Sequence, residues 1–201
     1  MKRYVTGCQH YQDNDIINFC KRPYRSTDEM NIDQIKKHNA IVGIEDEVIN
    51  TGDYVKHSAK AGGLLTAKDF DDQLNGKQIH IVGNHDRGNR NSLKTRTEEI
   101  ILGYKNLKVQ FLHDPNFARI DYKLIIHSHV HLMWRVKELR YLNHKSLLYN
   151  AGVDVNNFAP VNIEDILQIY YEWDSIKKDY DKTKSFLNKY NKGTKSEQRS
   201  Y

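Results

Sequence analysis

The chain carries, at residues 78–86, the sequence Gln-Ile-His-Ile-Val-Gly-Asn-His-Asp. Its first half becomes β-branched and apolar towards Gly83, which predicts a strand that ends at that glycine. The residues from Gly83 to Asp86 then lie on a loop at the C-terminal end of the strand. Asparagine and histidine carry oxygen and nitrogen atoms that bind divalent metals such as Mn, Fe and Zn. The stretch therefore predicts a metal-binding loop at the edge of a sheet.

Two further stretches have the same arrangement. Residues 51–53 read Thr-Gly-Asp, and residues 127–131 read His-Ser-His-Val-His, each after a run of apolar residues. Side chains alternate along an extended chain, so His129 and His131 point to the same side. His127 lies on that side too, further down the strand, where a core position and a position behind the metal ligands are equally open. Several such loops at one sheet edge make a metal centre, and a metal centre predicts hydrolysis.

Composition sets the frame for this prediction. The chain has 201 residues, 38% of them hydrophobic and 28% charged, which is typical of one domain with its own core. No run approaches the roughly 20 apolar residues of a membrane span. Met1 leads directly into a predicted first strand and not into a signal peptide. The two cysteines, Cys8 and Cys20, cannot form a secreted disulfide framework, so we expect a cytoplasmic protein.

Predicted strands and helices alternate along the chain. Ser26 with Glu29, and Thr66 with Asp69, have the spacing of helix-starting capping boxes. The predicted strands are 2–6, 47–50, 78–82, 107–112, 122–126 and 146–150, and the predicted helices are 14–20, 26–39, one from residue 66, and 163–187. This order predicts an α/β sandwich that binds ligands outside its strand ends.

The net charge of +5 is concentrated near the C-terminus, where residues 174–201 hold eight Lys/Arg and four Asp/Glu. We expect a main domain over residues 1–170, followed by a basic helix and tail over 171–201. Two interpretations of the tail are open. It contacts nucleic acid or another polyanion, or it is a solvated helix with a frayed end.

The order of these motifs resembles the calcineurin-like metallophosphoesterase superfamily. The matching elements are Gln-His at 9–10, Gly-Asp at 52–53, Gly-Asn-His-Asp at 83–86, His113, and Ser-His-Val-His at 128–131. Residues 16–24 and 150–161 further resemble a branch of small bacterial and phage phosphoesterases. The resemblance covers roughly residues 4–167. It implies a four-layer α/β/β/α sandwich, to which this chain adds a C-terminal helix.

The resemblance also implies a site with two divalent ions, manganese first among Mn, Fe, Zn and Ni. The first ion would be held by His10, Asp53, His131 and the residue at position 8, and the second by Asp53, Asn84, His113 and His129. Asp53 would bridge the pair, and His85, hydrogen-bonded to Asp86, would be the acid. The implied reaction is hydrolysis of a phosphomonoester or phosphodiester by a metal-activated hydroxide. Candidate phosphate contacts, chosen for their guanidinium groups, are Arg22, Arg87 and Arg90.

The chain departs from the family pattern at its first metal site. Cys8 stands in place of aspartate, Asp13 in place of histidine, and Ser128 in place of glycine. Three outcomes are open: Cys8 is a ligand that shifts the preference towards zinc or iron, the first site is weak and only one ion binds, or Asp13 supplies the missing carboxylate. A binding or regulatory protein on the same fold is therefore the alternative function. The substrate (nucleotide, nucleic acid, phosphoprotein or small metabolite) and the oligomeric state are not predicted.

Overall fold

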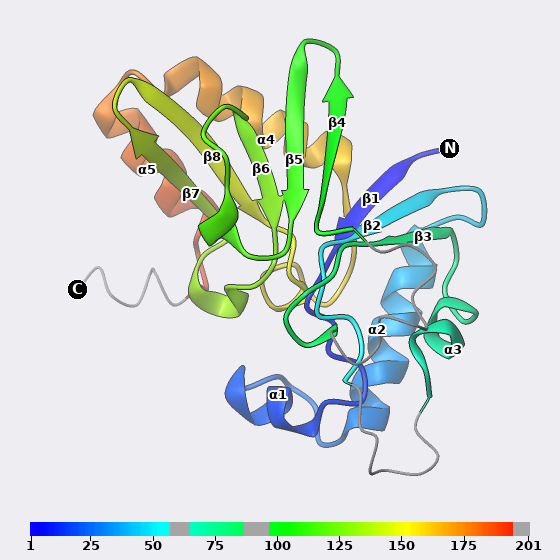
Figure 1. Cartoon of the computed structure of the whole chain (residues 1–201). Coiled ribbons are helices and arrows are strands. Elements are labelled where there is room, and N and C mark those ends of the chain that lie inside the picture. Colours follow the sequence, from blue (N-terminus) through cyan, green and yellow to red (C-terminus); the bar gives the residue numbers. More distant parts are fainter. Residues whose placement is uncertain (57–64, 87–96, 195–201) are drawn as a thin grey trace.

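A computed structural model describes residues 1–56, 65–86 and 97–194, which form two β-sheets flanked by helices (Figure 1). The strands are β1 (Arg3–Thr6), β2 (Glu47–Asn50), β3 (Lys77–His80), β4 (Glu99–Tyr104), β5 (Leu107–Leu112), β6 (Leu124–His127), β7 (Val136–Tyr141), β8 (His144–Asn150) and β9 (Val161–Asn162). The helices are α1 (Asn14–Phe19), α2 (Thr27–Ile41), α3 (Ala67–Asp71), α4 (Ile163–Ile176) and α5 (Tyr180–Tyr190).

The first sheet has the strand order β3-β2-β1-β9, with β1, β2 and β3 parallel. Thr6 pairs with Asn50, and Asn50 pairs with His80, so the three parallel strands end level with one another. The loops that follow them therefore leave the sheet together. These loops carry four of the predicted metal-binding positions, which are Cys8, His10, Asp53 and Asn84.

The second sheet has the order β4-β5-β6-β8-β7, and β5, β6 and β8 are parallel. Phe111 pairs with Ile126, and Ile126 with Tyr149, which again aligns the strand ends. The loop after β5 carries His113, and the loop after β6 carries the remaining histidines. Both sheets thus send their C-terminal loops towards one region, where parallel α/β sheets bind ligands.

Alternating side chains hold the two sheets together. Val5 and Ile49 of the first sheet lie in the same buried cluster as Leu124 and Ile126 of the second. Ile125, between the last two, faces the opposite way, into a smaller cluster beneath the surface loops. Helix α4 contacts β1, β8 and β9, and so completes the core. The predicted α/β sandwich is confirmed.

The C-terminal region corrects one prediction. The single helix expected over 163–187 is two helices, because α4 ends at Ile176 and Asp179 caps the start of α5 by accepting from the Lys182 N–H. Trp173 of α4 and Phe186 of α5 both lie in the main core. Each helix therefore buries apolar residues in the same core, as a single long helix would. The division of the chain at residue 170 stays a prediction, although α4 crosses that position. Residues 195–201 of the tail lie outside the described residues.

The sequence did not predict β4 and β7, which form the two edges of the second sheet. Both are partly exposed. β7 carries Lys137, Glu138 and Arg140 and so lacks the apolar run of a central strand, whereas β4 has the short apolar run Ile100–Leu102. Among the described residues, we find no helix with the length and apolar character needed to span a bilayer.

Candidate metal centre

The Asp53 carboxylate lies at the centre of the converging loops and is only 1% exposed. Its Oδ2 atom is 3.2 Å from Nε2 of His113 and 3.6 Å from Nε2 of His10. The two histidines come from different sheets, so one carboxylate oxygen faces donors on both sides. Burial alone would raise the pKa of Asp53, but the hydrogen bond and charge of His113 lower it to about 2. Asp53 is therefore an anion placed where a bridging ligand would stand.

One group of donor atoms surrounds His113. Its Nε2 atom lies 3.0 Å from Asn84 Oδ1 and 3.1 Å from His129 Nδ1. Nδ1 of His113 lies 2.9 Å from the carbonyl oxygen of Thr51, to which it can donate, which directs Nε2 towards the group. Burial opposes a charge on this ring, yet the Asp53 carboxylate raises the pKa of His113. The donors from Asp53, Asn84, His113 and His129 thus form a place that attracts positive charge, as the fit of a cation requires.

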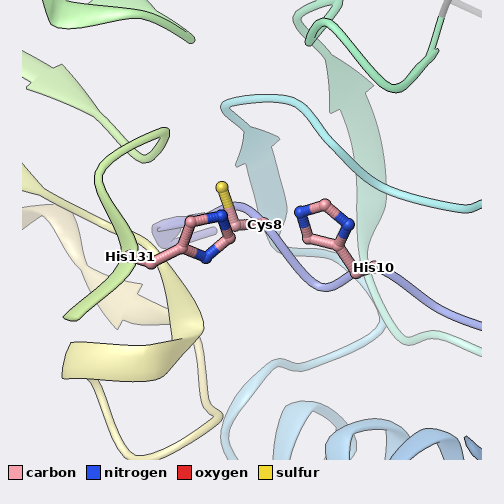
Figure 2. A group of neighbouring side chains, drawn as sticks. All are labelled: Cys8, His10 and His131. Carbon is pink, nitrogen blue, oxygen red and sulfur yellow. The ribbon is translucent and has the colours of Figure 1, made fainter. Parts of the chain in front are cut away.

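A second group contains Cys8, His10 and His131, whose candidate ligand atoms all lie within 4.8 Å of one another. Figure 2 shows the three side chains close together, with the Cys8 sulfur beside the His131 ring and the His10 ring across from them. His10 is 2% exposed, and among the described residues its Nε2 atom has no hydrogen-bond partner. Burial lowers the pKa of His10, which leaves a neutral ring with a lone pair directed into the group. This atom is a fitting metal ligand.

Carboxylates orient both of these rings from behind. Asp13 Oδ2 lies 3.3 Å from His10 Nδ1, and Asp154 Oδ2 lies 2.8 Å from His131 Nδ1. Lys56 donates to the other oxygen of Asp13 at 2.7 Å. The Asp13 carboxylate thus contacts His10 and Lys56, and its ligand atom also lies within 4.8 Å of those of His10 and His85, so the three outcomes for the first site stay open. Carboxylate–histidine pairs of this kind fix the ring tautomer in metal sites.

Arg22 differs from its predicted role as a substrate contact. Its side chain is fully buried and donates to both oxygens of Asp154, at 2.8 Å and 3.0 Å. It also donates to the carbonyl oxygens of Cys8, at 2.7 Å, and Gln9, at 2.8 Å. The guanidinium is therefore engaged inside the protein, where it joins the β1 loop to Asp154. Arg87 and Arg90, the other predicted contacts, lie outside the described residues.

His85 is exposed at the rim of the site, with its ring centroid 5.0 Å from that of His10. The prediction that His85 and Asp86 are hydrogen-bonded to each other is wrong. The buried Asp86 carboxylate accepts instead from the backbone N–H groups of Asp53, Tyr54 and Gly83, at 2.7, 2.9 and 2.9 Å. Asp86 therefore holds together the loops that carry the ligands. The backbone of His85 is held separately, because its N–H donates to Asp53 Oδ1 at 2.8 Å.

The backbone of the site is unusual. Cys8, His10, Asp53 and His131 have φ angles of 53°, 52°, 54° and 47°, in the left-handed region. Non-glycine residues rarely adopt this conformation, and such residues concentrate at functional sites. Gly83 is required for another reason, since a Cβ there would lie 2.2 Å from Asp53 Oδ1.

His127 is settled as a core residue. It is completely buried, and its ring packs on Trp134 with centroids 4.7 Å apart. His129 and His131 both reach the site, but not through the expected alternation along a strand, because β6 ends at His127 and Val130 has the turn angles φ −86° and ψ 3°. The roles of Asp154 and Arg22 were missed by sequence reasoning, although both residues lie in the stretches that carried the finer resemblance.

Two cavities adjoin the donor groups. One, of about 540 Å³, is lined by Asn84, His113 and His129 together with Phe117. The other, of about 550 Å³, is lined by His129, His131 and Phe19. The centre therefore lies beside open space large enough for a small ester.

Two facing sheets, with Asp, Asn and His side chains on the loops after their parallel strands, are the arrangement that the resemblance to metallophosphoesterases implied. By sequence, the chain belongs to one family with a protein of Methanocaldococcus jannaschii. It is 31% identical over 173 residues to the uncharacterized protein MJ1445 of Methanocaldococcus jannaschii, an alignment that covers 84% of this chain and 90% of that protein.

One solved structure shares the fold, and a second is less similar. The protein of unknown function AQ665 from Aquifex aeolicus has a TM-score of 0.64 at 18% identity and covers 84% of this chain and 98% of its own. A novel archaeal phosphodiesterase has a TM-score of 0.45 at 19% identity, and the match covers 76% of this chain and 84% of that one. No protein-family model matches the sequence.

Proposed function

We propose that the protein is a metal-dependent phosphoesterase that hydrolyses a phosphomonoester or phosphodiester at a dinuclear centre. The observation that carries the proposal is the place of Asp53 Oδ2, 3.2 Å from His113 Nε2 and 3.6 Å from His10 Nε2. A buried carboxylate between two imidazoles fits a bridge between two cations better than it fits a structural role. The buried His10 Nε2, without a partner among the described residues, supports the same conclusion.

Each donor group would hold one divalent ion, with manganese as the first candidate. His10, Asp53 and His131, with position 8, would hold one, and Asp53, Asn84, His113 and His129 the other. Such a pair of ions lowers the pKa of a coordinated water and neutralises phosphoryl oxygens. Asp13 and Asp154 would keep the His10 and His131 rings in the tautomer that presents a lone pair.

His85 is the proposed proton donor to the leaving-group oxygen. Its ring is exposed and lies beside the ring of the buried His10. His85 can therefore contact an ester that binds at the open rim of the site. The cavities beside His129 offer room for the leaving group. A positioned general acid contributes about 10²- to 10⁴-fold to a rate.

The test is hydrolysis of bis(4-nitrophenyl) phosphate and 4-nitrophenyl phosphate with added manganese. We expect Asp53→Asn and His85→Ala to lose most of the activity, and Tyr141→Ser, in an exposed hairpin far along the chain, to retain it. Equal rates in all four proteins would refute the proposal. Bound metal without hydrolysis by the wild type would favour the binding or regulatory alternative.

A further inference from the structure

The two donor groups differ in chemistry. The group around His113 offers two oxygens and two nitrogens, from Asp53, Asn84, His113 and His129. The group around His10 offers a sulfur, two nitrogens and the shared Asp53 oxygen. Hard oxygen donors suit manganese, whereas a sulfur with two imidazoles and one carboxylate is a four-donor set that suits zinc.

Several structural observations, besides its residue type, support Cys8 as a metal ligand. Its thiol is 0% exposed, and its ligand atom lies within 4.8 Å of those of His10 and His131, and also of those of Asp53 and His113. The 2% exposed His10 ring directs an Nε2 atom without a hydrogen-bond partner among the described residues into the same space. The left-handed backbone at Cys8 and His131 is a further sign that the group is held in this arrangement at a cost.

A second departure from the family pattern lies against the first. Ser128, which stands where the family has glycine, is buried, and its hydroxyl donates to the Thr51 carbonyl oxygen at 3.2 Å. A Cβ at Gly7 would lie 2.6 Å from the Ser128 Oγ atom, so the loops fit together closely at this point. The Ser128 hydroxyl therefore ties the loop after β6 to the loop after β2, beside Gly7, as outer partners hold metal ligands in position.

We propose that Cys8, His10, His131 and the shared Asp53 oxygen form a zinc-selective thiolate site, next to a manganese-type site around His113. Binding exchanges the thiol proton for the ion, with the proton released to solvent. The inference rests on the dinuclear centre of the proposed function and goes beyond it by assigning a different metal to each half.

The test uses the full-length protein stripped of metal and titrated with cobalt, whose bond to a thiolate gives a charge-transfer absorption band in the near ultraviolet. We expect the band in the wild type and in Cys20→Ser, and its loss in Cys8→Ser and Cys8→Asp. Ser128→Gly should keep the band and bind cobalt about 10-fold more weakly. Elemental analysis after dialysis against a large excess of manganese over zinc should show a lower zinc content in Cys8→Asp than in the wild type and in Cys20→Ser.

A band that persists in both Cys8 variants, or that disappears in Cys20→Ser, would overturn the inference. If Cys8→Ser does not fold, as judged by circular dichroism, Cys8→Asp restores the family residue and decides the question. The spectra need no substrate. A protein that binds cobalt through Cys8 but hydrolyses no ester would keep this inference and lose the proposed function, whereas hydrolysis without the band would do the reverse.

Discussion

Asp154 Oδ2 lies 2.8 Å from Nδ1 of His131, and the same carboxylate accepts from the buried Arg22 guanidinium. Asp154 follows β8, His131 follows β6, and Arg22 follows α1, so three separate parts of the chain meet behind one candidate ligand. Burial would raise the pKa of Asp154, but the His131 hydrogen bond and the Arg22 charge lower it to about 2. The carboxylate is thus an anion that orients the His131 ring.

Asp154→Asn should weaken metal binding at the Cys8–His10–His131 group by about 10- to 100-fold, because the amide keeps the shape and loses the charge that polarises His131. Isothermal titration with zinc measures this. Asp165→Asn, on the exposed start of α4, is the control. Equal affinities in the wild type and Asp154→Asn would mean that the carboxylate has no influence on the ligand.

Arg22→Met should lower the free energy of unfolding by about 3–5 kcal/mol, because it leaves a buried carboxylate unpaired. The matched control is Arg119→Met, whose ion pair with Glu99 has side chains 51% and 40% exposed. Exposed pairs contribute about 0–1 kcal/mol. Urea denaturation compares the two variants, and similar losses in both would contradict the structural role of Arg22.

His85→Ala should reduce kcat by about 10²- to 10⁴-fold and leave the metal content unchanged, because the His85 ring lies at the exposed rim whereas Asp53 and His113 are buried. Steady-state kinetics and elemental analysis on the same preparations separate the two effects. Loss of metal together with activity would identify His85 as a ligand and not as the acid.

Gly83→Ala should destabilise the protein by about 1–3 kcal/mol or displace Asp53, because its new Cβ would lie 2.2 Å from Asp53 Oδ1. Gly103→Ala in β4 is the control, since a Cβ there meets nothing within 4 Å. Thermal unfolding of both variants, with and without manganese, measures the effect. If Gly83→Ala and Gly103→Ala melt alike, the close packing at Asp53 is not as described.

The buried His127 predicts a pH dependence of stability. Burial, and secondarily the nearby His113, lowers the pKa of His127 well below its ordinary value, so the folded protein holds this ring neutral. The unfolded chain takes up the proton near pH 6.5, and the contribution of His127 is therefore complete above about pH 6.5 and declines as the pH falls. The slope is at most about 1.4 kcal/mol per pH unit.

His127→Phe should flatten that slope, since phenylalanine can pack on Trp134 and does not titrate. Urea denaturation of the wild type and the variant between about pH 5.5 and 7.5 measures the difference, within the range set by the ordinary histidine pKa. Parallel curves for the two proteins would show that His127 is protonated equally in the folded and unfolded states.

Much of the site could be predicted because its signals are local. A donor residue directly after a β-branched run lies at a strand end, as it does for Asp53 and Asn84. The helix starts at Ser26 and Thr66 were equally local, and both side chains accept from the backbone N–H three residues later. The strand β4 and the break before Asp179 gave weaker signals, because edge strands and adjacent amphipathic helices lack a distinctive pattern of their own.

The amino-acid sequence by itself determined which residues could bind metal and at which strand ends they stand, since backbone geometry ties side-chain direction to neighbouring residues. Only the tertiary structure decided which donors share an ion and what holds them. Arg22 and Asp154 are 132 positions apart, yet they form a buried pair. Asp86 binds backbone amides and not His85. Such pairings depend on how the two sheets pack, and no spacing along the chain encodes that packing.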